Sequence, residues 1–225
     1  MNSENTTAKS IPESKPTAYG LSQLNQIKLP DHDEAFLTSL AARLGGSPRW
    51  RAHKQMMTRQ MLALAQITDR LKLHWLDVAG DFRVLFDLRV TVPCLPDPHG
   101  PLQIASSATI GLTYREEFLA AAQPGYVYIS LIRPAAIWLA NSATDFGQPL
   151  CLGPKLEAGI PVKELIIATY LALSMQSYQF NERDSAGILN GAAATWWQHQ
   201  KSHPIPLSNE PFVTKTIPTN TEPKA

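Results

Sequence analysis

Two cysteines are the residues of this chain best suited to covalent chemistry, and one of them has an unusual setting. Cys151 occurs in GQPLCLGPKLEAGIPVKEL (147–165), where glycine and proline recur until a helical pattern begins. Loops on a rigid scaffold often carry reactive groups, and a cysteine thiolate is a strong nucleophile. Composition alone favours the other interpretation, in which Cys151 is a small structural residue with an inert thiol.

Cys94 ends an alternating stretch and enters the proline-rich turn of TVPCLPDPHGP (91–101). We predict that it is structural and half-buried, as many cysteines at strand ends are. A disulfide between Cys94 and Cys151 is possible in principle, but a chain of 225 residues without a dense cysteine framework does not need one. We therefore expect both thiols to be reduced.

Other familiar sites are missing from the sequence. It has no glycine-rich phosphate loop and no G-x-S-x-G motif, and its six histidines never stand at metal-ligand spacing beside a cysteine or another histidine. We expect neither a metal nor another cofactor. A formal net charge of +1 argues against a nucleic-acid partner. No stretch resembles a signal peptide or a membrane span, which predicts a soluble, cytoplasmic protein.

Polar, proline-containing stretches at both ends frame one predicted domain. Residues 1–30 and 204–225 carry too little apolar surface to offset the entropy of ordering them, so we expect mobile tails there. Residues 31–47 predict an extra N-terminal helix that stops at Gly45 and Gly46. Residues 48–203 form the main predicted domain, and 44% hydrophobic residues are enough to give it a core.

The main domain changes its hydrophobic period twice. From Pro48, apolar residues recur every three or four positions, which predicts a long helix. Alternation in FRVLFDLRVTV (82–92) predicts a strand with one buried face, and three further strands are predicted at 104–112, in GYVYISL (125–131) and in AAIWLA (135–140). A largely buried helix follows Pro161, and a last helix starts at Asp184 or at Asn190. The order predicts an α+β fold with a four-stranded antiparallel meander, because the strand connections are too short for helical crossovers.

Four pieces of sequence, the first of them a predicted strand, follow one another after the predicted long helix. They are PGYVYISL (124–131), GQPLCLG (147–153), AGIPVKELI (158–166) and DSAGILNGAAATWW (184–197). In this order and spacing they resemble the bacterial branch of the ubiquitin-conjugating enzymes, over about residues 48–200. The first helix and both tails have no counterpart in the resemblance.

The resemblance implies a function for Cys151. In this family a cysteine accepts the C-terminal carboxyl group of a ubiquitin-like protein from an activating enzyme, as a thioester, and passes it to an amine of a target protein. Bacterial members occur in antiphage operons that also encode the ubiquitin-like protein, the activating enzyme and a deconjugating protease. Cys151 is then the transthiolation nucleophile of a cofactor-free transferase, with those proteins as its partners.

One departure from the family concerns the oxyanion. Eukaryotic members carry a His-Pro-Asn motif upstream of the cysteine, whereas this chain reads IWLANSATDFG (137–147). Asn141 is the nearest asparagine; it stands ten residues before Cys151, somewhat too far for a direct alignment, and a turn residue is the alternative. We expect the backbone N–H groups of Leu152 and Gly153, or the Asn141 amide, to take the role of the missing asparagine.

Other residues receive implied roles as well. Asp184 stands where family members place a residue that orients the incoming amine, with a helix N-cap as the alternative, and Asp145 is a weaker candidate. In the family, the helix that corresponds to the predicted long helix docks on the activating enzyme. The resemblance therefore implies that the basic residues of this helix form a docking surface, although a solvated face is the simpler interpretation. These residues are Arg49, Arg51, Lys54 and Arg59. Only one of Trp196 and Trp197 is expected to face inward.

Two other functions remain open at the level of sequence. A non-catalytic carrier or scaffold of the same fold would bind a ubiquitin-like protein without transferring it, although inactive variants lack the cysteine. A cysteine hydrolase would need a general base, and no histidine lies in the loops that neighbour Cys151 in the sequence.

Overall fold

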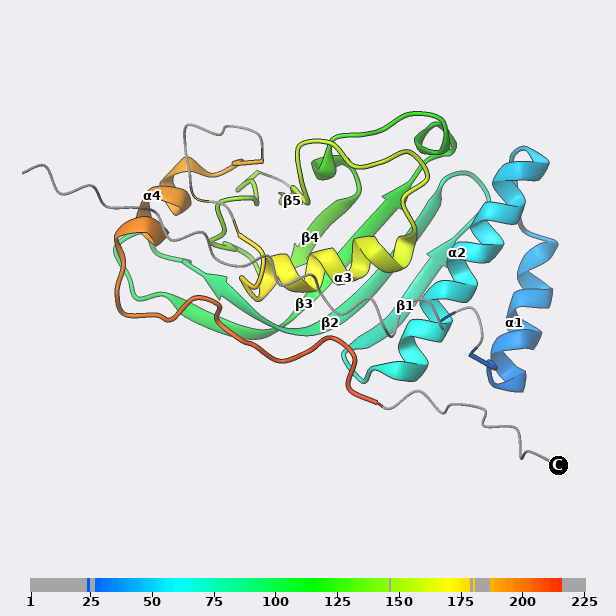
Figure 1. Cartoon of the computed structure of the whole chain (residues 1–225), viewed down its shortest axis with the longest axis horizontal. Helices are drawn as coiled ribbons and strands as arrows, with labels where there is room; N and C mark the ends of the chain where they lie inside the picture. Colours follow the sequence, from blue (N-terminus) through cyan, green and yellow to red (C-terminus); the bar gives the residue numbers. More distant parts are fainter. Residues whose placement is uncertain (1–23, 25–26, 146, 179, 181–186, 216–225) are drawn as a thin grey trace, which may run out of the picture.

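An antiparallel sheet of five strands forms the centre of the molecule, and helices cover one of its faces (Figure 1). The computed structural model describes Leu24, Phe180 and residues 27–145, 147–178 and 187–215. The strands are β1 (Leu71–Asp77), β2 (Phe82–Cys94), β3 (Gln103–Tyr114), β4 (Ile129–Arg133) and β5 (Pro149–Leu150). Each pairs with the next along the chain, which confirms the α+β class and the antiparallel meander, with five strands in place of four.

The strands differ from the prediction in two places. The sequence analysis missed β1, in which a register shift between Leu73 and Trp75 breaks the alternation of buried and exposed residues. The predicted strand AAIWLA (135–140) was wrong, because within it only Ile137 pairs, in an isolated bridge with Cys94. In GYVYISL, β4 begins at Ile129 and is preceded by a short 3-10 helix, η3 (Gly125–Val127).

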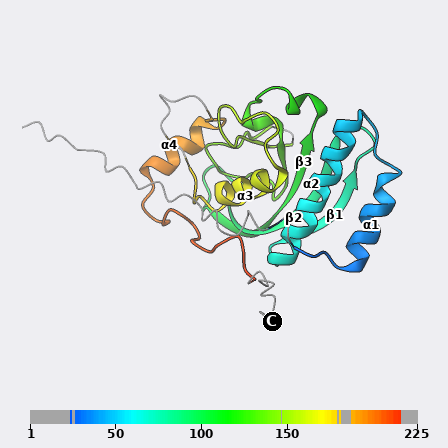
Figure 2. The ribbon, with the colours of Figure 1, turned by 45° about the vertical axis from the view of Figure 1, so that its right-hand side comes forward.

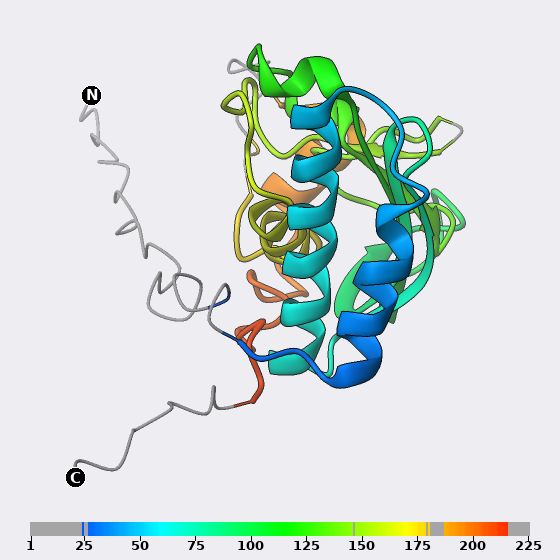
Figure 3. The same ribbon diagram turned by 90° about the vertical axis from the view of Figure 1, so that its right-hand side faces the viewer.

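Two N-terminal helices lie side by side at the β1 end of the sheet (Figures 2 and 3). Helix α1 is Asp31–Ala41 and α2 is Pro48–Ile67, as the hydrophobic spacing predicted. Ser47 caps α2, because its Oγ accepts a hydrogen bond of 3.1 Å from the Trp50 N–H. Pro48 occupies the first turn, where a helix needs no N–H donor.

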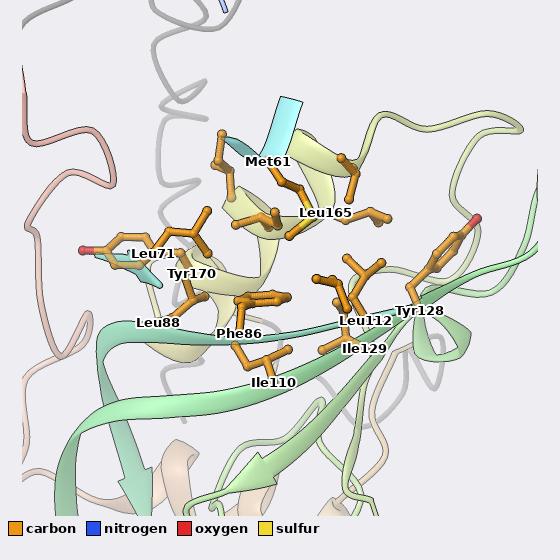
Figure 4. Packing of buried hydrophobic residues seen from close by; sticks show 14 of the residues in the cluster. Met61, Leu71, Phe86, Leu88, Ile110, Leu112, Tyr128, Ile129, Leu165 and Tyr170 are labelled. Atoms are coloured by element: carbon orange, nitrogen blue, oxygen red, sulfur yellow. The ribbon is translucent and has the colours of Figure 1, made fainter. Parts of the chain in front are cut away.

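The core lies between the sheet and the helices α2 and α3. Helix α3 (Val162–Leu173) is buried on most sides, as predicted, and Leu165 from it meets Met61 of α2 above Phe86 and Ile110 of the sheet (Figure 4). Helix α4 (Gly191–His199) begins at the second of the two predicted positions. The Asn190 side chain caps it by accepting a hydrogen bond of 3.0 Å from the Ala193 N–H. No helix within the described ranges is both long and apolar enough to cross a bilayer.

The predicted tails are shorter than expected at both ends. Leu24 and Leu29 are buried, and residues 204–215 run back along the molecule to the junction of α2 and β1. Phe212 is 6% exposed, and its ring centroid lies 5.4 Å from that of Tyr170 in α3. The Thr68 hydroxyl donates to the Phe212 carbonyl oxygen at 2.6 Å. Apolar residues and backbone acceptors thus order a segment whose composition suggested mobility; residues 1–23 and 216–225 lie outside the described ranges.

This C-terminal strap, residues 204–215, should contribute measurably to stability. We predict that Phe212→Ala lowers the free energy of unfolding by about 2 kcal/mol, because it exposes the apolar surface under a buried aromatic ring. Urea unfolding followed by circular dichroism measures the change. The exposed Lys215→Ala, in the same strap, is the matched control and should leave stability unchanged. Equal stability of the two variants would mean that the strap contributes nothing through Phe212.

Candidate active site at Cys151

Cys151 directly follows β5 and is held by backbone pairing on one side. Its N–H donates to the Asn141 carbonyl oxygen at 2.7 Å, and the Asn141 side-chain amide donates to the Cys151 carbonyl oxygen at 3.0 Å. Leu150, the preceding residue, pairs with both Ile129 and Ser142. Ten residues separate Asn141 from Cys151 along the chain, but the chain doubles back through the Ser142–Leu150 bridge and brings the two residues into contact.

The loop after Cys151 is tied to a second segment, residues 118–125. The Gly125 N–H donates to the Gly153 carbonyl oxygen at 2.9 Å. Gln123 and Leu156 exchange two backbone hydrogen bonds of 3.1 and 2.8 Å, and the Gly159 N–H donates to the Phe118 carbonyl oxygen at 2.9 Å. The glycine- and proline-rich loop is thus a fixed structure whose backbone groups find partners outside regular secondary structure.

A pocket of about 330 Å³ opens between this loop and α3. Leu152 and Pro154 line it from the loop, and Ala168 and Leu171 line it from α3, so its walls are mostly apolar. None of its described lining residues carries a charge. A pocket of this character suits a neutral acyl group and offers, among its described residues, no cationic side chain to pair with a free carboxylate.

Cys151 lines this pocket, and its thiol is not on the open surface. The residue is 5% exposed, and its Sγ donates to the Gly153 carbonyl oxygen at 3.3 Å. A Cβ atom on Gly187 would lie 3.9 Å from the sulfur, so Gly187 also lies beside the thiol. A partner therefore has to reach the sulfur through the pocket.

Burial raises the pKa of the Cys151 thiol, and a hydrogen bond with the Gly153 backbone acts in the opposite direction. Because the pKa lies above its ordinary value, the thiol is protonated at neutral pH, and the thiolate fraction keeps growing as the pH rises past that ordinary value. The free protein thus holds a protected thiol, and its nucleophilic form requires loss of a proton to a base other than the described lining residues.

Histidine does not supply that base. All six histidines fall within the described ranges, and none lines the pocket or bonds to the Cys151 sulfur. The described residues also contain no group of three histidine, cysteine, aspartate or glutamate side chains that could hold a metal ion.

The structure locates the other predicted site residues unevenly. Leu152 and Gly153 line the pocket beside the sulfur, and within the described ranges the Leu152 N–H has no acceptor. Asp145 is exposed and does not line the pocket. Asp184 lies outside the described residues. Cys94 is buried and unpaired with Cys151, so both thiols are free, and burial raises the Cys94 pKa as well.

The predicted basic docking surface on α2 contains one error. Arg49 and Arg51 are exposed, whereas Lys54 is fully buried and its ammonium donates to the carbonyl oxygens of Val78 and Gly80. Burial lowers the Lys54 pKa, opposed by nearby carboxylates. Lys54 lies on the same helical face as the core residues of α2, so it cannot belong to a solvated stripe. Arg59 is engaged by Glu34 of α1 at 2.9 Å.

Helix α4 agrees with the expectation for its tryptophans. Trp197 is buried, and its indole N–H donates to the Trp138 carbonyl oxygen at 2.7 Å, whereas Trp196 is half-buried. Sequence reasoning missed Gly125, Ala168 and Leu171 as neighbours of the site. The Pro-Gly pair at 124–125 was a signal for the first of them, because such pairs mark tight turns.

Comparisons of the chain with protein-family models, with curated proteins and with solved structures find no match. What can be said of function therefore rests on the sequence pieces quoted above and on the geometry around Cys151.

Proposed function

We propose that this protein is a conjugating enzyme that accepts a ubiquitin-like protein as a thioester on Cys151 and transfers it to a target amine. The observation that carries the proposal is the position of the Cys151 sulfur at a neutral pocket, on a loop fixed by backbone hydrogen bonds on both sides. The similarity of the four sequence pieces to the conjugating enzymes supplies the reaction class.

The first half-reaction is a thioester exchange. The Cys151 thiolate attacks the carbonyl carbon of the thioester on the activating enzyme, a C–S bond forms to Cys151, and the thiolate of the activating enzyme leaves and takes up a proton. In the second half-reaction a target amine attacks the new thioester, the Cys151 thiolate leaves, and the ammonium proton passes to solvent. Each step passes through an oxyanion, and we assign its stabilisation to the Leu152 N–H, which has no acceptor among the described residues.

Asn141 has a holding role in this proposal. Its side-chain amide is engaged with the Cys151 carbonyl oxygen, so it fixes the backbone that carries the nucleophile. This leaves the oxyanion to the backbone amides of the loop. Since orientation is a large part of catalysis when two reactants are held together, a residue that fixes the nucleophile still affects the rate.

Two alternatives are less well supported. A cysteine hydrolase needs a general base for the thiol, and none of the six histidines is near the sulfur. A carrier that only binds a ubiquitin-like protein has no need of a thiol at a pocket. The transferase accounts for both the presence of Cys151 and the neutral walls around it.

The central test is thioester formation. Incubation with the activating enzyme, the ubiquitin-like protein and ATP should give an adduct on a non-reducing gel that a thiol reductant removes. We expect Cys151→Ala to abolish the adduct and Cys94→Ala, the matched control for a buried free cysteine, to retain it. Absence of any adduct on the wild type contradicts the proposal, and equal loss from both variants would point to a folding role of the cysteines.

Asn141→Ala separates holding from oxyanion stabilisation. We expect discharge of the preformed thioester to free lysine to slow by less than about 10-fold, well below the roughly 100-fold or more that the loss of an oxyanion donor costs. Single-turnover discharge measures the rate. A collapse of discharge with normal loading would instead assign the oxyanion role to the Asn141 side chain.

Arg49 and Arg51 are the basic residues of α2 that remain available for docking. Charge reversal of both to glutamate should slow loading from the activating enzyme, because it removes electrostatic steering of the encounter. Added salt should slow the wild type more than the variant, since screening removes what the variant already lacks. Lys54 is left unchanged because it is buried. Equal loading rates at low salt would return both arginines to the role of solvated surface residues.

A further inference from the structure

Gly125 is linked to the candidate nucleophile through a single carbonyl group. Its N–H donates to the Gly153 carbonyl oxygen at 2.9 Å, and the same oxygen accepts the hydrogen bond of the Cys151 thiol at 3.3 Å. Gly125 is buried and belongs to η3, which precedes β4, so it is anchored to the sheet. The Gly153 carbonyl is thus fixed from the side of the sheet and from the side of the sulfur.

No side chain can replace the hydrogen on Gly125 without moving the loop. A Cβ atom there would lie 2.5 Å from the Gly153 oxygen, 2.6 Å from the Gly153 nitrogen and 2.8 Å from the Leu152 nitrogen. All three atoms belong to the backbone, so no rotation of a side chain relieves the overlap. Even one methyl group would displace the backbone of Leu152 and Gly153 from its position beside Cys151.

Among the described glycines, only Gly125 is crowded by the backbone of the Cys151 loop. Among the glycines of the described ranges, Gly45 and Gly46 also leave no room for a Cβ atom, but the atoms they would meet belong to Ala79 and Trp50. Gly111, in β3, offers a contrast, since a Cβ atom there would make only ordinary contacts of 3.7 Å or more. A glycine requirement that arises from the Cys151 loop is therefore found at position 125.

We infer that Gly125 is a positioning residue, which sets the backbone of Leu152 and Gly153 against the Cys151 sulfur and thereby fixes both the carbonyl oxygen that accepts the thiol hydrogen bond and the N–H groups offered to an oxyanion. The part that concerns the oxyanion rests on the proposed function. The part that concerns the thiol does not, because it follows from contacts that exist in the free protein. The hydrogen bonds between Gln123 and Leu156 continue the same attachment further along the loop.

The experiment compares Gly125→Ala with Gly111→Ala. Alkylation of Cys151 by iodoacetamide is followed by mass spectrometry of its peptide as a function of pH, with the Cys94 peptide as an internal measure of folding. In the wild type and in Gly111→Ala the rate should rise with pH and should not level off by pH 9, because burial raises the Cys151 pKa above its ordinary value. In Gly125→Ala we expect the displaced loop to uncover the sulfur and so relieve the burial that raises its pKa, which outweighs the loss of the smaller, opposing contribution of the Gly153 hydrogen bond. The profile should therefore move to lower pH, with Cys151 alkylated several-fold faster at pH 7.5 and Cys94 unchanged.

Transfer gives the second readout. Single-turnover discharge to lysine should fall by roughly 100-fold in Gly125→Ala, as expected for a misplaced reacting group, and should stay at the wild-type rate in Gly111→Ala. Gly125→Ala with both the pH profile and the discharge rate of the wild type overturns the inference. If the wild type forms no thioester, the proposed function fails, and the alkylation profile still decides whether Gly125 positions the loop.

Hydrogen exchange on the wild-type protein decides the question without any variant, should Gly125→Ala fail to fold. The Gly125 amide should be protected to the same degree as those of Gln123 and Leu156, while the Leu152 amide, which has no acceptor among the described residues, exchanges rapidly. A Gly125 amide that exchanges as fast as that of Leu152 overturns the inference.

Discussion

The need to cover one apolar face of the sheet governs the arrangement of this molecule. Phe86 and Ile110 point to the same side, and α3 lies across them with Leu165 against Met61 of α2 (Figure 4). Burial of this much apolar surface is the main favourable term in folding, so α3 has little freedom in where it lies. Its first residue, Val162, comes shortly after Cys151, and the intervening loop must therefore span the edge of the sheet.

That loop has few side chains with which to stabilise itself. Its backbone groups would be left without partners if the neighbouring segments did not supply them. Asn141 provides partners on one side of Cys151, and residues 118–125 provide them on the other. The rigidity of the candidate site is therefore a property of three segments that are distant in the sequence, and Cys151 alone has little part in it.

Hydrophobic periodicity was enough to predict the elements whose pattern is unbroken. Helix α2 and strand β2 have regular spacing and were predicted from their first residues, although the helical spacing continued to Leu71, which belongs to β1. Strand β1 was missed because the register shift after Leu73 interrupts its alternation. Local pattern carries no information about such irregularities, which depend on the partner strand.

Other differences arose because contacts between distant residues override composition. Lys54 has the charge of a surface residue, but its position in the helical repeat faces the core, where the carbonyl oxygens of Val78 and Gly80 accept hydrogen bonds from its ammonium group. Asn141 was judged by its separation from Cys151 along the chain, and the fold cancels that separation. The Pro-Gly pair at 124–125 indicated a turn, but the contact of Gly125 with the Cys151 loop lies in the absence of space, which only the packed structure reveals.

The C-terminal strap also affects when the junction of α2 and β1 can finish folding during synthesis. The Arg70 guanidinium donates to the Pro211 carbonyl oxygen at 3.0 Å and pairs with Glu210 at 2.6 Å, and its side chain is 8% exposed. Until those residues leave the ribosome, the nascent chain carries a positive charge beside its core without the acceptors that compensate its burial, which is costly. The junction of α2 and β1 therefore emerges early and closes late, and a chain released before residue 210 would keep that corner open to water.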